Sequence, residues 1–161
     1  MIRDVELNDA KSICDIYNNY VQNTVITFEE KVITAQEMSK RIKKITANHC
    51  FIVYEIESKI VGYAYASTWR QRSAYRYCVE STIYVDENHK GKGIGTKLYE
   101  ELIKRLKELN YHVIMGIIAL PNESSVRLHE KTGFYKAGHF KKVGKKLDKW
   151  IDVGYWQYDI R

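Results

Sequence analysis

The residues of this chain that could do chemistry gather in one stretch, residues 80–96. It opens with an acidic residue, Glu80, in a run of β-branched and aromatic residues typical of a strand. It ends in a glycine-rich loop, Gly91-Lys-Gly-Ile-Gly95, after which apolar residues recur at helical spacing. Glycines let a backbone approach a ligand closely, and a helix N-terminus carries unpaired N–H groups and partial positive charge. The stretch therefore predicts an anion-binding loop between a strand and a helix.

The spacing of the glycines excludes two familiar nucleotide loops. A phosphate-binding P-loop requires Gly-x-x-x-x-Gly-Lys followed by Ser or Thr, and the sequence contains no such run. A dinucleotide loop requires Gly-x-Gly-x-x-Gly, but here the order is Gly91-x-Gly93-x-Gly95, and Thr96 follows. The anion is therefore expected to be a pyrophosphate held in a different kind of loop.

The composition is that of an ordinary globular chain. Of the 161 residues, 45% are hydrophobic and 29% are charged, which suits a single domain over residues 1–161. No apolar run approaches the ~20 residues that a membrane-spanning helix needs. The first residues also lack a basic-then-apolar signal pattern. We therefore expect no membrane association.

The three cysteines, Cys14, Cys50 and Cys78, are odd in number and widely spaced. They fit neither a disulfide framework nor a zinc-binding pattern, so we expect no metal site and a reducing, cytoplasmic environment. Free cysteines usually behave as small buried hydrophobic residues. We expect all three to do so here.

The net charge is +6, and much of it falls late in the chain. Charge runs are usually solvated surface, so we favour a basic, solvent-exposed face without a nucleic-acid partner. Nucleic-acid binding and attraction of a polyanionic small ligand are the two alternatives. The lysines concerned are Lys136, Lys141, Lys142, Lys145, Lys146 and Lys149.

The pattern of the whole chain predicts a mixed α/β sheet with helices on both faces. Helices are expected after an N-cap at Asn8, from a capping box at Thr34, from Ile94 to Leu109 on one buried face, and from Asn122 to a terminating Gly133. Strands are expected over residues 2–6, 51–56, 60–67, 83–85, 112–119, 134–142 and 150–160.

This order of elements, with the loop written as Lys90-x-x-Gly93-x-Gly95, resembles the GNAT superfamily of acetyl-CoA-dependent N-acetyltransferases. The family usually has Gln or Arg where this chain has Lys90. A second family signature, an Asn before a helix that ends in aromatic-Glu-x-x-Gly-Phe, appears as Asn122 and His129-Glu-Lys-Thr-Gly-Phe134, with His129 replacing the usual Tyr. The resemblance implies the acyl-CoA N-acyltransferase fold, with a central mixed, mostly antiparallel sheet.

Three runs of residues, 79–85, 120–130 and 150–157, resemble phosphinothricin N-acetyltransferases more closely, and so does Tyr75 after its arginine-bearing loop. The resemblance extends over nearly the whole chain. It implies transfer of acetyl from acetyl-CoA to a small amino-acid-like amine. The expected acceptor is phosphinothricin, methionine sulfoximine or methionine sulfone. It also implies a homodimer, with the aromatic last strand in the core and at the dimer contact. No Cys lies in the motifs, so we expect direct attack without an acetyl-enzyme.

The resemblance assigns the cofactor site to the strand, the loop and the next helix. The backbone of the strand would pair with the pantetheine arm, the glycine loop would hold the pyrophosphate, and an Asn side chain would bond the arm from the other side. The residues concerned are Ile83, Tyr84, Val85, Lys90, Gly91, Lys92, Gly93, Ile94, Gly95, Thr96 and Asn122.

Glu80 is the expected catalytic base. An amine arrives protonated, only its free form attacks a thioester, and a nearby carboxylate can remove the proton. The alternative for Glu80 is an ion pair with Arg70 or Arg72. His129 could protonate the leaving thiolate, assist Glu80 or serve only in packing.

The expected acceptor site contains two arginines, whose forked guanidinium groups suit carboxylate and phosphinate groups. Surface charge is the alternative for these arginines, and core packing is the alternative for Phe28. Two other functions also stay open: acetylation of a polyamine or a protein N-terminus, and a non-catalytic basic binding module. The expected acceptor-binding residues are Phe28, Arg70, Arg72, Tyr75, Glu80 and Thr82.

Overall fold

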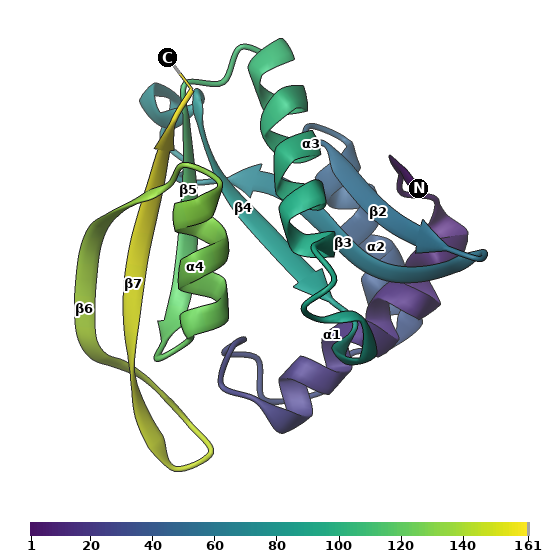
Figure 1. Ribbon diagram of the computed structural model, residues 1–161, viewed down its shortest axis with the longest axis horizontal. Coiled ribbons are helices and arrows are strands. Elements are labelled where there is room, and N and C mark those ends of the chain that lie inside the picture. The colour runs from purple at the N-terminus through teal and green to yellow at the C-terminus, as the bar shows by residue number, and fades with distance from the viewer. Residues whose placement is uncertain (161) are drawn as a thin grey trace.

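One seven-stranded sheet runs through the computed structural model, which describes residues 1–160 (Figure 1). The strand order is β1-β2-β3-β4-β5-β7-β6, and within these residues only β4 and β5 pair in parallel. The predicted mixed, mostly antiparallel sheet is therefore confirmed. The strands are β1 (Ile2–Asp4), β2 (Phe51–Ile56), β3 (Lys59–Thr68), β4 (Cys78–Val85), β5 (Val113–Leu120), β6 (Tyr135–Lys146) and β7 (Lys149–Asp159).

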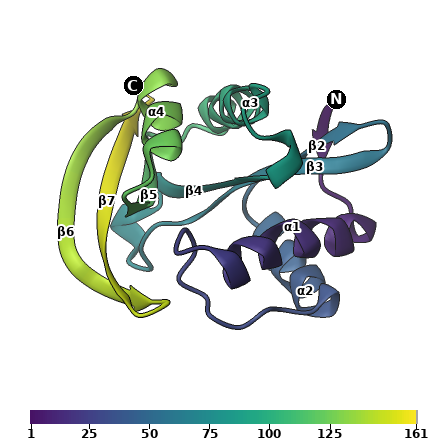
Figure 2. The same ribbon diagram turned by 60° about the horizontal axis from the view of Figure 1, so that its bottom comes forward.

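The helices lie on both faces of the sheet, as predicted. Helices α1 (Ala10–Asn23) and α2 (Ala35–Thr46) cover one face, and α3 (Ile94–Glu108) and α4 (Glu123–Lys131) cover the other (Figure 2). Each helix turns an apolar stripe toward the strands, because apolar residues three or four positions apart share one face. The result is one hydrophobic core on each side of the sheet.

Of the two helix starts predicted from capping residues, one is confirmed. Thr34 caps α2 as expected, since its hydroxyl accepts a hydrogen bond from the Glu37 N–H at 3.1 Å. The prediction for Asn8 is wrong, because Asn8 lies inside the short 3-10 turn Leu7–Asp9 and α1 begins only at Ala10. The buried Asp9 carboxylate is the group that orders this turn, because it accepts from the Glu6 N–H and from Arg3.

The β6–β7 hairpin is longer than predicted. The prediction ended the first strand at residue 142, but pairing continues to Lys146 opposite Lys149. The two turn residues, Leu147 and Asp148, adopt left-handed φ angles of 49° and 58°, which match the twist of a tight hairpin. The run of lysines obscured the strand pattern.

The expectation for the cysteines holds in part, because all three are free but only Cys14 is fully buried. The expectation of a solvated lysine face is wrong at one position, since Lys146 is only 3% exposed.

The α3 stripe was predicted to include Leu109, and this is also wrong. Leu109 follows the last residue of α3 and is 56% exposed, whereas Leu106 is fully buried. The helix ends at Glu108, and Leu109 is its exposed C-terminal cap residue.

We predict that Leu106→Ala lowers the free energy of unfolding by about 2–5 kcal/mol, because it leaves a cavity in the core. Leu109→Ala is the matched control in the same helix end and should change it by less than about 0.5 kcal/mol. Denaturant titration of the two variants measures both values. Equal losses would contradict the assigned end of the buried face.

Candidate functional site

The centre of the molecule is the place where β4 and β5 separate. The two strands pair over only four residues, from Cys78 opposite Val113 to Ser81 opposite Gly116. Beyond that point β4 continues beside β3 and β5 continues beside β7, without pairing with each other (Figure 1). The expected splayed strand is therefore present, and each strand turns an unpaired backbone edge toward the gap.

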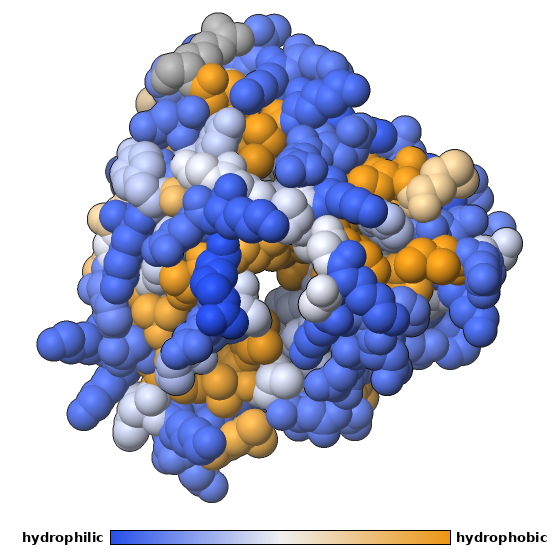
Figure 3. Space-filling model, in the orientation of Figure 1, coloured by the Kyte–Doolittle hydropathy of each residue, from blue (hydrophilic) through white to orange (hydrophobic). Residues whose placement is uncertain are grey.

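A cavity of about 580 Å³ fills this gap, and Figure 3 shows a hollow with apolar side chains around it. Seven of the residues predicted from sequence line it: Phe28, Glu80, Thr82, Ile83, Tyr84, Asn122 and His129. Residues that sequence reasoning missed also line it, among them Ile26, Thr27, Tyr99, Ser125, Phe140, Val143 and Tyr155.

Glu80 is half-buried on β4, at the wall of the cavity. Burial raises the pKa of its carboxyl group above the ordinary value, and the charge of Arg70 partly opposes this rise. The Arg70 guanidinium lies 4.7 Å from the centre of the Trp69 ring, and this contact holds it near the end of β3. A carboxylate with a raised pKa beside a cavity is suited to accept a proton near neutral pH.

His129 is buried on α4 and joins a short chain of hydrogen bonds. Its Nδ1 lies 2.7 Å from the Ser125 carbonyl oxygen, so we place the ring proton on Nδ1. Its Nε2 then accepts from the Tyr99 hydroxyl, which lies at 2.7 Å. Burial lowers the pKa of His129, so the ring is kept neutral. A neutral ring in this tautomer has no N–H left to offer to the cavity.

Tyr99 is fully buried on α3, and its hydroxyl also lies 2.9 Å from Ser81 Oγ. Burial raises the pKa of Tyr99, so the hydroxyl stays protonated. The sequence showed only an aromatic residue in an apolar helix. Its partner His129 is 30 positions away, and nothing in the local pattern connects the two.

The glycine loop has the backbone conformations that the sequence indicated. Gly91 and Gly93 adopt left-handed φ angles of 76° and 77°, and α3 begins directly after Gly93. Gly95 serves packing instead, because an added Cβ would lie 3.1 Å from Leu128 of α4. The loop and helix start therefore present backbone N–H groups at one end of the separated strands.

Two polar side chains of the predicted cofactor site have contacts of their own. The Lys90 ammonium lies 4.9 Å from the centre of the Tyr20 ring and 3.6 Å from a Glu87 oxygen. Asn122 caps α4 by accepting from the Ser125 N–H at 3.3 Å, and it also lines the cavity. Lys90 is otherwise exposed.

Several predicted residues lie outside the lining of the cavity. Val85 and the loop residues 90–96 lie beyond it along the strand, and Lys92 is exposed. Arg70, Arg72 and Tyr75 are exposed in the connection between β3 and β4.

Across residues 1–160, no group of three His, Cys, Asp or Glu side chains is arranged to hold a metal ion. None of the helices in this part of the chain has the length and apolar character needed to cross a membrane.

We predict that Gly116→Ala disturbs the His129 ring, because an added Cβ would lie 2.5 Å from its Nε2. Such overpacking should cost about 1–3 kcal/mol of unfolding free energy. Gly138→Ala is the matched strand control, since its Cβ would lie 3.9 Å from its nearest neighbour. Denaturant titration compares them, and equal stabilities would contradict the tight packing of His129 on β5.

Comparison with known proteins agrees with this arrangement. The family model described as "Acetyltransferase (GNAT) domain" matches residues 2–154. A phosphinothricin N-acetyltransferase from Streptomyces viridochromogenes is 36% identical over 159 residues, which are 99% of this chain and 87% of the relative. An L-methionine sulfoximine/L-methionine sulfone acetyltransferase from Salmonella typhimurium is 30% identical, over 99% of this chain and 94% of the relative.

A crystal structure is similar over the same length. It is a GNAT superfamily phosphinothricin acetyltransferase from Sinorhizobium meliloti in complex with AcCoA. The TM-score is 0.96 and the identity 37%, and the match covers 99% of this chain and 87% of that one.

Proposed function

Because this chain belongs to the GNAT acetyltransferase family, whose members use acetyl-CoA, we propose that it acetylates the amine of a small amino-acid-like acceptor. The acceptor we propose is phosphinothricin or methionine sulfoximine or sulfone. The observation that carries the proposal is the half-buried Glu80, whose raised pKa and position on the cavity wall suit a base beside the gap between β4 and β5.

The residues around the gap fit an extended ligand with a pyrophosphate. The unpaired edge of β4 beyond Ser81 can pair with the amides of a pantetheine arm, as a further strand would. The left-handed Gly91 and Gly93 and the start of α3 suit the pyrophosphate. Asn122 faces the same cavity from α4. When bound, acetyl-CoA supplies an activated thioester carbonyl.

In this proposal Glu80 removes the proton from the acceptor ammonium, and the free amine attacks the thioester directly. A C–N bond forms, the C–S bond of the thioester breaks and the thiolate leaves. The nitrogen loses two protons in all: Glu80 takes one before the attack, and the second, lost as the amide forms, supplies the proton that the thiolate requires. A positioning role suits His129 better than that of an acid, because its Nδ1–H is bound to Ser125 and its Nε2 to Tyr99.

The acceptor would bind on the side of the cavity lined by Phe28, Glu80 and Thr82. Arg70 and Arg72 are proposed to meet its carboxylate and its second polar group, since guanidinium groups bind such oxygens in pairs. Tyr75 belongs to the same connection. The names of the relatives support this choice over a polyamine, whose charge would disfavour a site with two arginines.

We also propose that the chain acts as one domain in a homodimer in the cytoplasm. Seven strands from β1 to β7 share one sheet, which supports a single domain. Large apolar side chains remain exposed on the β6–β7 hairpin, which supports a subunit contact there. They are Tyr135 (47% exposed), Phe140 (54%), Val143 (58%), Leu147 (55%) and Trp150 (63%). Free thiols at all three cysteines suit a reducing compartment.

The proposal is tested by release of free thiol from acetyl-CoA across a panel of amines. We expect turnover with phosphinothricin, methionine sulfoximine or methionine sulfone, and none with spermidine or a peptide with a free N-terminal alanine. Turnover with only the last two would overturn the proposed acceptor class. Release with none of these amines would remove the small-acceptor proposal altogether.

We predict that Glu80→Gln lowers kcat by about 100- to 10,000-fold, the contribution typical of a general base. The amide keeps the size of the side chain but cannot take the proton, so acetyl-CoA should bind with unchanged affinity. Thiol release measures the first effect and calorimetry the second. Full activity in this variant would show that Glu80 is not the base.

A pH dependence follows from the charges near Glu80. The base acts only when ionised, so kcat/KM should fall as the pH decreases through its raised pKa. The positive charge of Arg70 opposes that rise, so Arg70→Met should raise the pKa further and move the acidic limb to higher pH. Arg72→Met serves as the control and should leave the limb in place. An unmoved limb in Arg70→Met would argue against Glu80 as the titrating group.

A further inference from the structure

The wall of the cavity nearest Phe28 is built from two segments far apart in the sequence. One is the connection between α1 and α2, which contains Ile26, Thr27 and Phe28 and has no helix or strand. The other is β6, which contributes Phe140 and Val143. A connection of this kind needs contacts from outside itself to hold one position.

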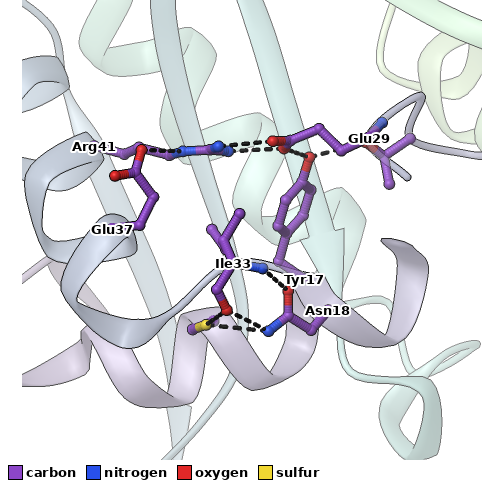
Figure 4. A network of polar contacts seen from close by, with 8 residues as sticks. Tyr17, Asn18, Glu29, Ile33, Glu37 and Arg41 are labelled. Carbon is purple, nitrogen blue, oxygen red and sulfur yellow. Dashed lines mark hydrogen bonds and ion pairs between the residues drawn. The ribbon is translucent and has the colours of Figure 1, made fainter. Parts of the chain in front are cut away.

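The side of this connection that faces α1 and α2 is firmly held (Figure 4). The Tyr17 hydroxyl of α1 lies 2.8 Å from Thr27 Oγ1 and also donates to the Glu29 carboxylate. Arg41 of α2 binds the same carboxylate with two hydrogen bonds of 2.8 and 2.7 Å. Such bidentate, charge-assisted pairs are strong and fix geometry.

The other end of the connection, at Ile33, is hydrogen-bonded to α1. The Asn18 amide accepts from the Ile33 N–H at 3.0 Å and donates to the Ile33 carbonyl at 2.8 Å (Figure 4). These contacts fix the connection on α1 and α2, but none of them sets its distance from β6.

Lys146 supplies that missing contact. It is the last residue of β6, it is 3% exposed, and its ammonium donates to the Thr27 carbonyl oxygen at 2.8 Å across 119 residues of sequence. Within residues 1–160 its ammonium forms no ion pair, but the charges of Glu30 and Glu29 in the same connection act on it and partly oppose the lowering of its pKa by burial. Burying an ammonium is costly unless it is hydrogen-bonded, so the bond to the Thr27 carbonyl favours this position of the hairpin against the connection.

Phe28 makes the adjoining contact. A Cβ at Gly144 would lie 2.4 Å from Cε2 of the Phe28 ring, so the ring rests directly on the backbone of β6. Lys146 is two residues further along this strand, and Thr27 is the neighbour of Phe28. The hydrogen bond and the ring contact therefore hold the same two segments together.

We propose that Lys146 is a positioning residue for the acceptor, which fixes the distance between the β6–β7 hairpin and the Thr27–Phe28 wall. This inference rests on the proposed function, because the wall belongs to the acceptor side of the cavity. Lys146 itself does not line the cavity, so it acts through Thr27 and Phe28. The glycine loop on the proposed acetyl-CoA side belongs to other elements, and the Lys146 hydrogen bond does not reach it.

The test is Lys146→Met, which keeps an unbranched side chain but removes the donor and the charge. We expect KM for the acceptor to rise about tenfold, the loss typical of one hydrogen bond from a charged group. We expect kcat and the KM for acetyl-CoA to stay within about twofold of the wild-type values. Lys149→Met is the matched control, because Lys149 pairs with Lys146 across the same turn but is exposed. An acceptor KM equal in the two variants would overturn the proposal.

Hydrogen exchange on the same proteins gives a readout that does not need activity. Lys146→Met should speed amide exchange in residues 24–33 and leave α3 unchanged, whereas Lys149→Met should change neither. If the wild-type chain acetylates none of the amines, the proposed function fails while this measurement still tests the contact. Lys146→Gln, whose amide can donate to Thr27, should fall between Lys146→Met and wild type, and it replaces Lys146→Met if that variant does not fold. Unchanged exchange in the folded variant would overturn the contact.

Discussion

The separation of β4 and β5 is the constraint on which the rest of the molecule depends. Parallel strands normally continue to pair because unpaired N–H and C=O groups are costly when buried. Here pairing stops after Ser81 and Gly116, and each strand keeps its other neighbour. The sheet therefore stays continuous at one end and opens into a cavity at the other. The proposed acetyl-CoA site follows from this one interruption, since it exposes backbone edges beside Glu80.

Burial is the common cause of the unusual titration in the cavity wall. It raises the pKa of Glu80 and lowers that of His129, because both groups lose hydration in their charged forms. The consequences differ for the two residues. His129 is satisfied as a neutral ring by Ser125 and Tyr99, whereas Glu80 lies close enough to Arg70 for its charge to limit the rise. Similar desolvation thus makes one residue a fixed neutral group and leaves the other able to exchange a proton.

The sequence predicted what depends on neighbouring residues and missed what depends on distant ones. The glycine loop, the Thr34 cap and the order of strands and helices were predictable because each is written in a short window. The prediction for Asn8 failed because Asp9 binds Arg3 and Glu6 instead. Tyr99 gave no local signal, because its partner is 30 residues away on another helix. The family resemblance supplied candidates for the site, but it could not indicate that Arg72 and Tyr75 are exposed and outside the cavity lining.

Lys146 shows how little a count of charges says about position. In the sequence it is one of six late lysines, and nothing in the local pattern distinguishes it from the other five. In the structure it is buried where the hairpin crosses the connection after α1, and its bond to Thr27 has no counterpart among its neighbours in the run. Its charge therefore acts locally, toward the Thr27 carbonyl and the carboxylates of Glu29 and Glu30. The same hairpin carries the exposed apolar side chains of the proposed subunit contact and one wall of the cavity, so the two proposals concern one shared element.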